Sequence, residues 1–536
     1  MGDGREPTAS SAGRGGAGAA LVAAGILVSR VLGFVRDAVV AHVLGTTAAG
    51  GALRAALRIP NLLQNLFGER ALPASFIPVY ARLRADGHDE DAVRTAGAVL
   101  ALLALLSAVI TALGVTFAAP LVALLTPGFD APTRALTTSL VRIMFPGVGL
   151  LVLSAWCLGV LNSHRRFFLA YASPALWNVA IIGAVLVGPR DGLDDGARLF
   201  AWGALIGSAL QVLVQVPSVL TLVRGVRPVV RLDLPPVRAV LRTFGPALAS
   251  RGAAQLGGFV DLQIATLVSA GAVAALGLGQ SITMLPVSLF GMAVSAAELP
   301  ALSATGGDAS ARAAAMCSRL DAAQRRIAFF VVPSAVAFLA LGDAIAAALY
   351  RSGRFGADDA QWLWGILAGA AVGLLAGTLA RLVSSAFFAL QDTRTPFRIA
   401  LVRIIGGVAL GWVAALVLPQ RLGLDPRWGA AGLTLAGGLA GWGEFLLLRR
   451  ALARRLGGVP SLGLRVVPLW GAAAAAAGLA WAVRVVLVPT GTPTRGTACL
   501  LLAVFAAAYG AATLLFGVDE ARMLVARLTR RGGRPR

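Results

Sequence analysis

Charged side chains lie inside an apolar run, Ser29–Gly45, that is long enough to cross a bilayer as a helix. The charged residues are Arg30, Arg36 and Asp37. On membrane-insertion scales a central Arg or Asp costs roughly 2.5–3.5 kcal/mol, so such residues usually face a bundle interior or a watery cavity. Charged residues in such positions mark the pathway of a polar substrate. The bland alternative is that the arginines snorkel from a helix end.

The spacing of these residues favours a lined interior. Ser29 and Arg36 are seven residues apart, as are Arg30 and Asp37, so each pair shares a helical stripe about two turns long. We therefore take all four residues as candidates for binding a polar substrate.

A second polar stripe follows along the next apolar stretch. Arg54, Arg58, Asn61, Asn65 and Glu69 recur every three or four residues, which places them on one face of a helix. We expect this face to lie opposite the charges of the first helix. Arg54, Arg58, Asn61 and Glu69 join the substrate-binding candidates.

The second half of the chain also carries isolated charges in apolar runs. These are Arg251, Asp261, Glu298, Arg381 and Arg403. Arginines outnumber carboxylates, and a guanidinium suits phosphate or diphosphate through paired hydrogen bonds. In the bland alternative, each arginine is neutralised by a carboxylate, for instance Arg30 by Asp37 or Arg251 by Asp261, and Glu298 and Arg403 lie at helix ends.

Composition sets the class of protein. The chain has 536 residues, of which 57% are hydrophobic and 13% charged, with a mean hydropathy of +0.79. Apolar stretches of about 18 or more residues recur along it, so we predict an all-α polytopic membrane protein rather than a soluble enzyme. The net charge of +22 indicates loop arginines that fix topology, and no basic domain suggests nucleic-acid binding.

No motif indicates catalysis, a metal or a cofactor. The cysteines and histidines are scattered, at Cys157, Cys317, Cys499, His42, His88 and His164. The glycines between Gly365 and Gly377 indicate a helix face for close packing rather than a phosphate-binding fingerprint.

Hydropathy predicts about fourteen helices. Their centres fall near Val31, Leu62, Leu105, Val152, Ile181, Gln211, Phe259, Phe290, Val336, Leu374, Val408, Gly438, Ala475 and Phe505. An even count puts both termini on one side. Alternate connections are arginine-rich, as at Arg82/Arg84/Arg94, Arg165/Arg166, Arg224/Arg227/Arg231/Arg238, Arg394/Arg398 and Arg449/Arg450/Arg454/Arg455. By the positive-inside rule this set and both termini are cytoplasmic.

A weak internal repeat divides the chain. Ser29-Arg30 corresponds to Ser250-Arg251, and Phe67-Gly68 to Phe290-Gly291, which suggests two lobes of six helices. We expect a disordered cytoplasmic tail at 1–16, an N-lobe at 17–232, a C-lobe at 233–456, two further helices at 457–520 and a basic tail at 521–536.

Several blocks resemble a known family. They read SRVLGFVRDAVVAHVLG (29–45), RIPNLLQNLFGERALPASFIPVYARL (58–83), LNSHRRFFLAYASPALWNVAII (161–182), LPVSLFGMAVSAAELPALS (285–303) and AFFALQDTRTP (386–396). They are similar to the MviN/MurJ lipid II flippases of the multidrug/oligosaccharidyl-lipid/polysaccharide exporter superfamily. The resemblance implies a cationic central cavity between two lobes, alternating access and a lipid-tail groove formed by the last two helices, 457–520.

Matching positions carry the family's roles. The resemblance implies that the arginines among Ser29, Arg30, Arg36 and Asp37 bind the diphosphate-bearing headgroup, and Glu69 also matches. Four positions depart from the family pattern, namely Gly51, Gln64, Ser281 and Met284, where polar or charged residues are expected. We hypothesise that Arg54 replaces the charge missing near Gly51, and that Arg251 replaces the arginine missing at Ser281.

The resemblance also bears on energy coupling. Some members have a sodium site with a carboxylate on the seventh helix, which Asp261 matches. Its expected partners fall on Gly407, Gly411 and Gly437. A lone carboxylate is a poor sodium cage, since hard cations need several oxygens. We therefore expect no cofactor, and favour the membrane potential, or a proton carried by Asp261, over Na⁺.

Together these patterns predict a lipid II flippase of the bacterial inner membrane, with membrane lipids and the cell-wall synthesis machinery as further partners. The nearest alternative is a paralogue that flips another polyprenyl-diphosphate-linked glycan, and another is a transport-deficient scaffold. A membrane glycosyltransferase is less favoured, because it needs a catalytic carboxylate in a sizeable extramembrane loop and no connection exceeds roughly 25 residues.

Overall fold

The computed structural model describes residues 10–63, 71–188, 192–292, 294–295, 298, 309–458, 466–488, 491–523 and 526. Within these ranges the chain is helical, and its one isolated β-bridge joins Ser352 and Phe355. Contacts divide the chain into two compact units, residues 1–262 and 263–536.

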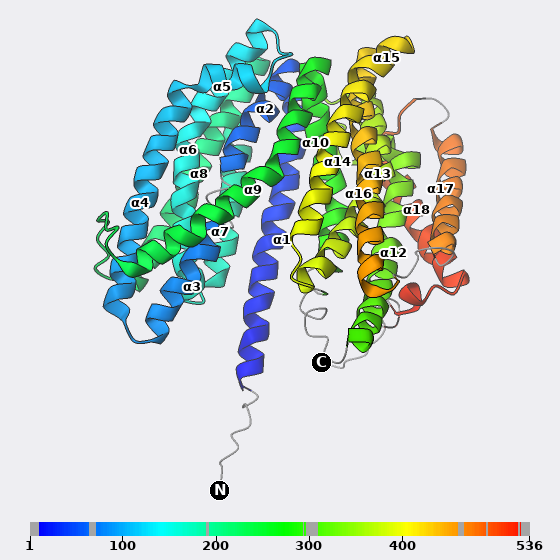
Figure 1. The fold of residues 1–536 in the computed structure, drawn as a ribbon. Coiled ribbons are helices and arrows are strands. Elements are labelled where there is room, and N and C mark those ends of the chain that lie inside the picture. The colour runs from blue at the N-terminus through cyan, green and yellow to red at the C-terminus, as the bar shows by residue number, and fades with distance from the viewer. Residues whose placement is uncertain are drawn as a thin grey trace, which may run out of the picture. The chain divides into compact units, whose positions relative to one another are not determined.

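Unit 1 holds the helices drawn from blue to green in Figure 1. They are α1 (Ser10–Leu44), α2 (Ala48–Leu63), α3 (Ala71–Ala85), α4 (Asp89–Thr116), α5 (Ala118–Leu125), α6 (Ala131–Ser163), α7 (Phe167–Val187), α8 (Leu193–Leu222) and most of α9 (Pro235–Val268). α6 packs between α4 and α8, and α1 packs against α7.

Unit 2 begins with the end of α9. Its other elements are α10 (Ala270–Pro286), η2 (Val287–Met292), α12 (Ala309–Tyr350), α13 (Ala357–Ala389), α14 (Arg394–Trp412), η3 (Val413–Val417), α15 (Leu418–Arg421), η4 (Pro426–Trp428), α16 (Gly429–Leu456), α17 (Val467–Leu487) and α18 (Arg495–Leu515). α13 packs against both α12 and α16, and α17 and α18 pack on α12.

The predicted helix pattern is confirmed. All fourteen expected centres fall in helical segments, and eleven described helices are long and apolar enough to span a membrane. The remaining centres lie in α1, α2 and α9, which the charged residues interrupt. Within the described residues, α9 has an apolar stretch at Gly257–Val268, and the described part of α2 is Ala48–Leu63.

The expected domain bounds stay predictions, and two observations are relevant to them. The units divide after Leu262 rather than at residue 232, because Val240 of α9 is buried in the same cluster as Trp156 and Tyr80 of unit 1. The helix α1 also begins at Ser10, so residues 10–16 are helical instead of a disordered tail. A helix that is already nucleated propagates at little cost into an alanine-containing segment.

A buried cluster in unit 1 holds the helices around the charged residues of α1 and α2. Its members include Leu44 of α1, Leu53 of α2, Phe145 of α6 and Phe200 of α8. In a membrane, close packing of small residues drives helix association. Gly207 of α8 illustrates this, because a Cβ there would lie 2.8 Å from the Cα of Trp177 on α7.

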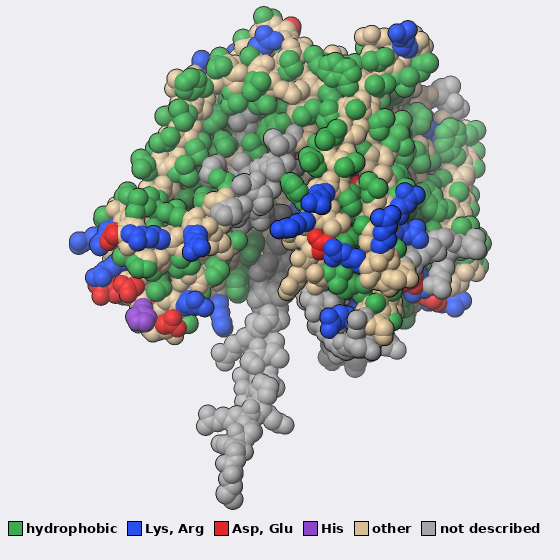
Figure 2. Space-filling view, viewed as in Figure 1, with side chains coloured by type: hydrophobic (Ala, Val, Ile, Leu, Met, Phe, Trp, Pro, Cys, Tyr) green, Lys and Arg blue, Asp and Glu red, His purple; other side chains and the backbone are tan. Residues whose placement is uncertain are grey.

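Charged side chains are not spread evenly over unit 1. Figure 2 shows that Arg, Asp and Glu gather at the end of the unit that carries α3, whereas hydrophobic side chains cover the visible length of α4 and α6. This distribution is that of a protein whose helices cross the hydrocarbon core with their charged connections outside it.

Candidate functional site

A charged cluster forms where α1, α2 and α7 meet. We name Arg36, Asp37, Arg54 and Asn178 the α1–α2 cluster. Arg36 donates to Asp37 Oδ1 from Nη2 at 2.9 Å and from Nε at 3.2 Å. Its Nη1 donates to Asn178 Oδ1 at 3.1 Å. Arg54 Nη2 lies 3.3 Å from Asp37 Oδ1.

α7 fixes the position of Arg36. The guanidinium carbon lies 5.3 Å from the centre of the Trp177 ring, within the range of a cation–π interaction. The neighbouring Asn178 donates from Nδ2 to the carbonyl oxygen of Ser29 at 3.4 Å. α7 thus holds α1 at two points, seven residues apart, on the stripe that the sequence predicts.

The α1–α2 cluster carries surplus positive charge. Two arginines share the carboxylate of Asp37, whose side chain is only 5% exposed. Although Arg54 Nη2 is buried and close to Asp37, it makes no hydrogen bond in the described part of the chain. A buried donor without an acceptor is costly, and an incoming phosphate oxygen would satisfy it. The geometry therefore suits an anion that reaches Arg54.

Arg58 does not join this cluster. Its Nη2 donates to the carbonyl oxygen of Gly258 on α9 at 3.1 Å, and it interacts electrostatically with Asp261. Arg54, one turn earlier, faces the charges of α1 as expected. Gly258 allows the approach of α9, because a Cβ there would collide with Arg58 Nη2.

A small pocket lies beside Trp177. Its lining includes Pro60 and Asn61 of α2 and Ser208 of α8, and its empty volume, open solvent included, is about 260 Å³. Asn61 is exposed there. The pocket and the α1–α2 cluster therefore share one aromatic wall.

The other predicted site residues are dispersed or lie outside the described residues. Arg30 is exposed on α1, and Ser29 is partly exposed. Glu69 and the side chain of Arg251 lie outside the described residues. Asp261 is exposed on α9.

The departures from the family pattern are neutral in the structure as well. Ser281 donates from Oγ to the Gly277 carbonyl of its own helix at 3.2 Å. Met284 is 42% exposed, and Gly51 is buried. Gln64 lies outside the described residues.

The sequence-based reasoning missed several partners. Asn178 and Trp177 lie in a block that was noted only for its family resemblance, with no charge to mark them. Glu444 of α16 lies 3.0 Å from Arg403, measured from Oε2 to Nε. Glu298 faces Arg326 at 3.8 Å and Arg319 at 3.9 Å.

The largest omission is a buried ion pair that joins α12 to α17. Asp343 accepts two hydrogen bonds from Arg484, at 2.6 and 2.9 Å, and the two side chains are 5% and 16% exposed. Each is a lone charge in an apolar run, and the opposite signs were the available signal.

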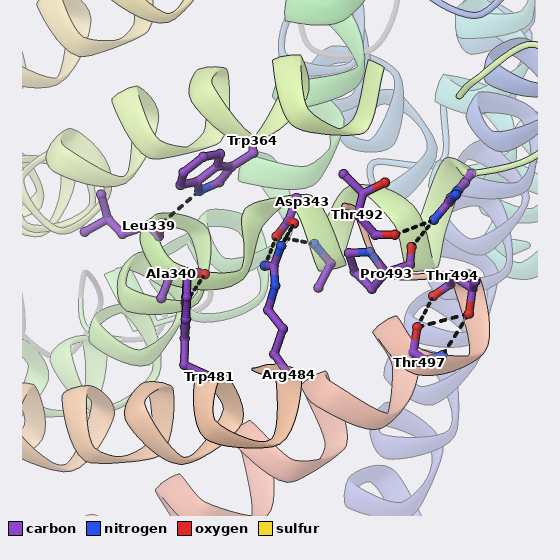
Figure 3. Close-up of polar contacts among 12 residues, drawn as sticks. Leu339, Ala340, Asp343, Trp364, Trp481, Arg484, Thr492, Pro493, Thr494 and Thr497 are labelled. Atoms are coloured by element: carbon purple, nitrogen blue, oxygen red, sulfur yellow. Dashed lines mark hydrogen bonds and ion pairs between the residues drawn. The ribbon is translucent and has the colours of Figure 1, made fainter. Parts of the chain in front are cut away.

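This pair lies at a break in α12. Leu341 departs from helical geometry, with φ −130°. Figure 3 shows indole groups from two neighbouring helices on the carbonyls beside the break: Trp364 donates to Leu339 at 2.8 Å and Trp481 to Ala340 at 3.0 Å. Such donors satisfy carbonyls that a kinked helix leaves unpaired.

Two arginines connect the end of α12 with the start of α18. Arg351 donates to the carbonyls of Thr492 and Pro493 before α18. Arg495 donates to Ala348 and Leu349 at the end of α12, each at 3.2 Å. We name the contacts around Asp343–Arg484 and Arg351 the α12–α17 clamp (Figure 3).

Metal-binding groups do not gather anywhere in the described ranges: no three His, Cys, Asp or Glu side chains there could hold an ion. At the positions that match the sodium site of some relatives, a Cβ on Gly411 would lie 2.8 Å from Leu433, and one on Gly407 would lie 3.4 Å from Ala440. Of these glycines, Gly411 serves close helix packing.

Sequence comparisons identify relatives over most of the chain. The family model described as lipid II flippase MurJ matches residues 40–501. A lipid II flippase MurJ from Burkholderia cenocepacia is 32% identical over 84% of this chain and 87% of its own length. A probable lipid II flippase MurJ from Bdellovibrio bacteriovorus is 32% identical over 82% of each chain.

Solved structures share the fold. A lipid II flippase MurJ in an inward closed conformation superposes with a TM-score of 0.75 at 21% identity, over 93% of this chain and 99% of its own. An inward-facing multidrug transporter of the MATE family superposes with a TM-score of 0.63 at 17% identity, over 80% and 95%. With the family model and the relatives matching most of its length, this multi-pass membrane protein belongs to the lipid II flippase MurJ family.

Proposed function

We propose that this chain moves lipid II, the undecaprenyl-diphosphate-linked peptidoglycan precursor, outward across the bacterial inner membrane. Membership of the MurJ family supports the substrate, and the α1–α2 cluster is the observation that carries the mechanism. Asp37 balances only one of the two arginines, and the diphosphate would bind to the remaining positive charge.

In this mechanism the protein works by alternating access. The headgroup binds to Arg36 and Arg54 from the cytoplasmic side while the prenyl chain stays in lipid. Diphosphate is too polar to enter a membrane interior without cations that replace its water. A change in the orientation of the lobes then exposes the same arginines to the outside.

The topology belongs to the same proposal. Arginine-rich connections support a cytoplasmic location for both termini, in accordance with the positive-inside rule. The basic residues of the last ten positions, which would lie on that side, are outside the described residues.

The membrane potential is the proposed driving force. A potential of 100 mV is worth about 2.3 kcal/mol per charge moved, so it acts on the surplus charge of the unloaded cluster. A proton carried by Asp261 is the alternative. Imposing potassium diffusion potentials of either sign on proteoliposomes, with and without Na⁺, distinguishes these drivers, and Asp261→Asn tests the proton.

The decisive experiment is flipping of labelled lipid II in proteoliposomes. We expect Arg36→Gln and Arg54→Gln each to lower the rate at least tenfold. The matched control is Arg198→Gln, because Arg198 pairs with Asp195 at 2.9 Å in an exposed position at the start of α8. Wild-type flipping by both cluster variants would refute the mechanism.

A second candidate function rests on the neutral surface of α10. Because Ser281 and Met284 offer no charge where the family resemblance leads us to expect it, the protein could serve another polyprenyl-diphosphate-linked glycan. Complementation of cells depleted of their lipid II flippase separates the two functions. Rescue supports lipid II, and failure despite normal membrane expression supports the other glycan.

A further inference from the structure

Charged side chains of α13, α14 and α16 interact in unit 2. Arg403 of α14 pairs with Glu444 of α16, with 3.0 Å between Nε and Oε2. Arg381 of α13 interacts electrostatically with both of them. We name Arg381, Arg403 and Glu444 the α13–α16 cluster.

The three residues of this cluster occupy comparable positions along their helices. Arg381 lies eight residues before the end of α13, Arg403 nine after the start of α14, and Glu444 twelve before the end of α16. At about 1.5 Å per residue, all three lie roughly 12–18 Å from those helix ends. An ion pair of 2.6 Å between Asp392 and Arg455 ties the same ends together. The three residues therefore lie at a similar level, away from the helix ends that this ion pair joins.

The cluster has more cation than anion. Two arginines accompany a single carboxylate, and the Arg403–Glu444 contact is an ion pair without a hydrogen bond in the described part of the chain. Within the same described residues, the guanidinium of Arg381 donates no hydrogen bond and lies in no ion pair. A guanidinium group that makes no hydrogen bond can donate to an incoming anion.

Space is available next to the charges. Arg381 is exposed, and the side chain of Arg403 is 42% exposed. Gly377 lies one turn from Arg381, and Gly441 about one turn from Glu444. A Cβ on either glycine would meet no atom within 4 Å. A group that bridged the two guanidinium groups would thus find both donors and room.

We propose that the α13–α16 cluster is a second anion site that binds the diphosphate of a polyprenyl-linked lipid. Arg381 and Arg403 donate to the phosphate oxygens, and Glu444 pairs with Arg403 while the site is empty. Phosphate and diphosphate oxygens are the acceptors that guanidinium groups match best. The choice of diphosphate over another anionic headgroup rests on the proposed function.

The test measures lipid binding to the purified full-length protein in detergent by native mass spectrometry. The probes are undecaprenyl diphosphate and dioleoylphosphatidylglycerol. We expect Arg381→Gln and Arg403→Gln each to weaken binding of the diphosphate lipid about tenfold, the usual effect of losing one charge-assisted hydrogen bond. The matched control is Arg398→Gln, because Arg398 is an exposed arginine on α14, the helix of Arg403. This variant should bind the lipid as the wild type does.

Glu444→Gln separates binding from packing. If the cluster binds an anion, removal of the competing carboxylate keeps or raises affinity. If the cluster only packs helices, Glu444→Gln lowers the unfolding temperature as much as Arg403→Gln does. Neither substitution then changes the affinity for the diphosphate lipid. The second pattern would overturn the proposal.

Two further outcomes are decisive. Equal affinity for both lipids would refute the diphosphate assignment, and wild-type affinity in Arg381→Gln would refute the site. Because flipping is tested through Arg36 and Arg54, the two proposals fail separately. Normal binding by Arg381→Gln leaves the proposed function intact, and normal flipping by Arg36→Gln leaves this second site intact.

Discussion

The α1–α2 cluster and the α12–α17 clamp both place Arg and Asp inside the helical bundle, and they differ in how completely those charges are matched. In the clamp, one arginine meets one aspartate through two hydrogen bonds, of 2.6 and 2.9 Å. In the cluster, Arg36 and Arg54 share Asp37, and a buried nitrogen of Arg54 makes no hydrogen bond among the described residues.

This difference separates a structural role from a binding role. A balanced, fully hydrogen-bonded pair leaves nothing for a ligand to complete, whereas a surplus cation keeps a donor for one. The α13–α16 cluster resembles the α1–α2 cluster in this respect, because it also has more guanidinium groups than carboxylates. The number of acceptors per guanidinium is thus more informative than the presence of a buried arginine.

The clamp should show the largest change in stability. Arg484→Gln leaves the buried Asp343 carboxylate without its partner. Removing one partner of a buried ion pair lowers the free energy of unfolding by about 3–5 kcal/mol. We expect a large fall in the unfolding temperature, measured by fluorescence-detected size-exclusion chromatography. The double variant Asp343→Leu with Arg484→Met should recover most of the loss, because it removes both charges. A single variant as stable as the wild type would show that the clamp is dispensable.

Removal of the shared carboxylate should have an intermediate effect. Asp37→Asn leaves Arg36 and Arg54 facing each other without a carboxylate, at a cost of about 1–3 kcal/mol. The unfolding temperature should fall by less than in Arg484→Gln, and added diphosphate should raise it again. If diphosphate stabilises wild type and variant equally, the two arginines do not form the anion site.

Removal of the surplus arginine should hardly change stability. Arg54→Gln leaves Arg36 and Asp37 as a balanced pair and removes a buried donor that makes no hydrogen bond in the described part of the chain, so we expect a change of about 1 kcal/mol or less in the free energy of unfolding. Flipping in proteoliposomes should nevertheless fall at least tenfold. The comparison breaks down if Arg54→Gln destabilises the protein as strongly as Arg484→Gln does.

The smallest effect is expected at a pair outside the spans. Asp392, in the connection from α13 to α14, accepts from Thr395 Oγ1 at 2.6 Å and lies 2.6 Å from Arg455. The hydrogen bonds from Thr395, together with the charge of Arg455, hold the pKa of Asp392 below its usual range.

A lowered pKa in the folded state stabilises the fold above the unfolded pKa of about 3.9, and this contribution is lost as pH falls through the folded pKa. We therefore expect the small difference in unfolding temperature between Arg455→Gln and wild type to shrink as pH falls from about 5 to about 3. A difference that grows on acidification would contradict this assignment.

Much of the fold could be predicted, because hydropathy is a local property. Every expected helix centre lies in a helical segment, and the seven-residue spacing in α1 anticipated its polar stripe. The neighbours of α9 could not be predicted: Val240 is buried with Trp156 and Tyr80, and hydropathy does not report which neighbours a helix contacts.

The candidate site was only half predictable. Arg36, Asp37 and Arg54 stood out as charges in apolar runs. Their neutral partners Asn178 and Trp177 did not, because an amide or an indole in an apolar run carries no comparable cost. Arg58 shared the stripe of Arg54 but turned to α9, since residues one turn apart on a helix can face different neighbours.

By itself, then, the sequence determined that this is a polytopic helical membrane protein of the MurJ type with buried arginines that need partners. Only the tertiary structure decided which partners they have. Arg36 and Asn178 are 142 residues apart in sequence, and Asp343 and Arg484 are 141 apart. The cost of a buried charge is fixed locally by residue type and depth, whereas its neutralisation depends on long-range packing.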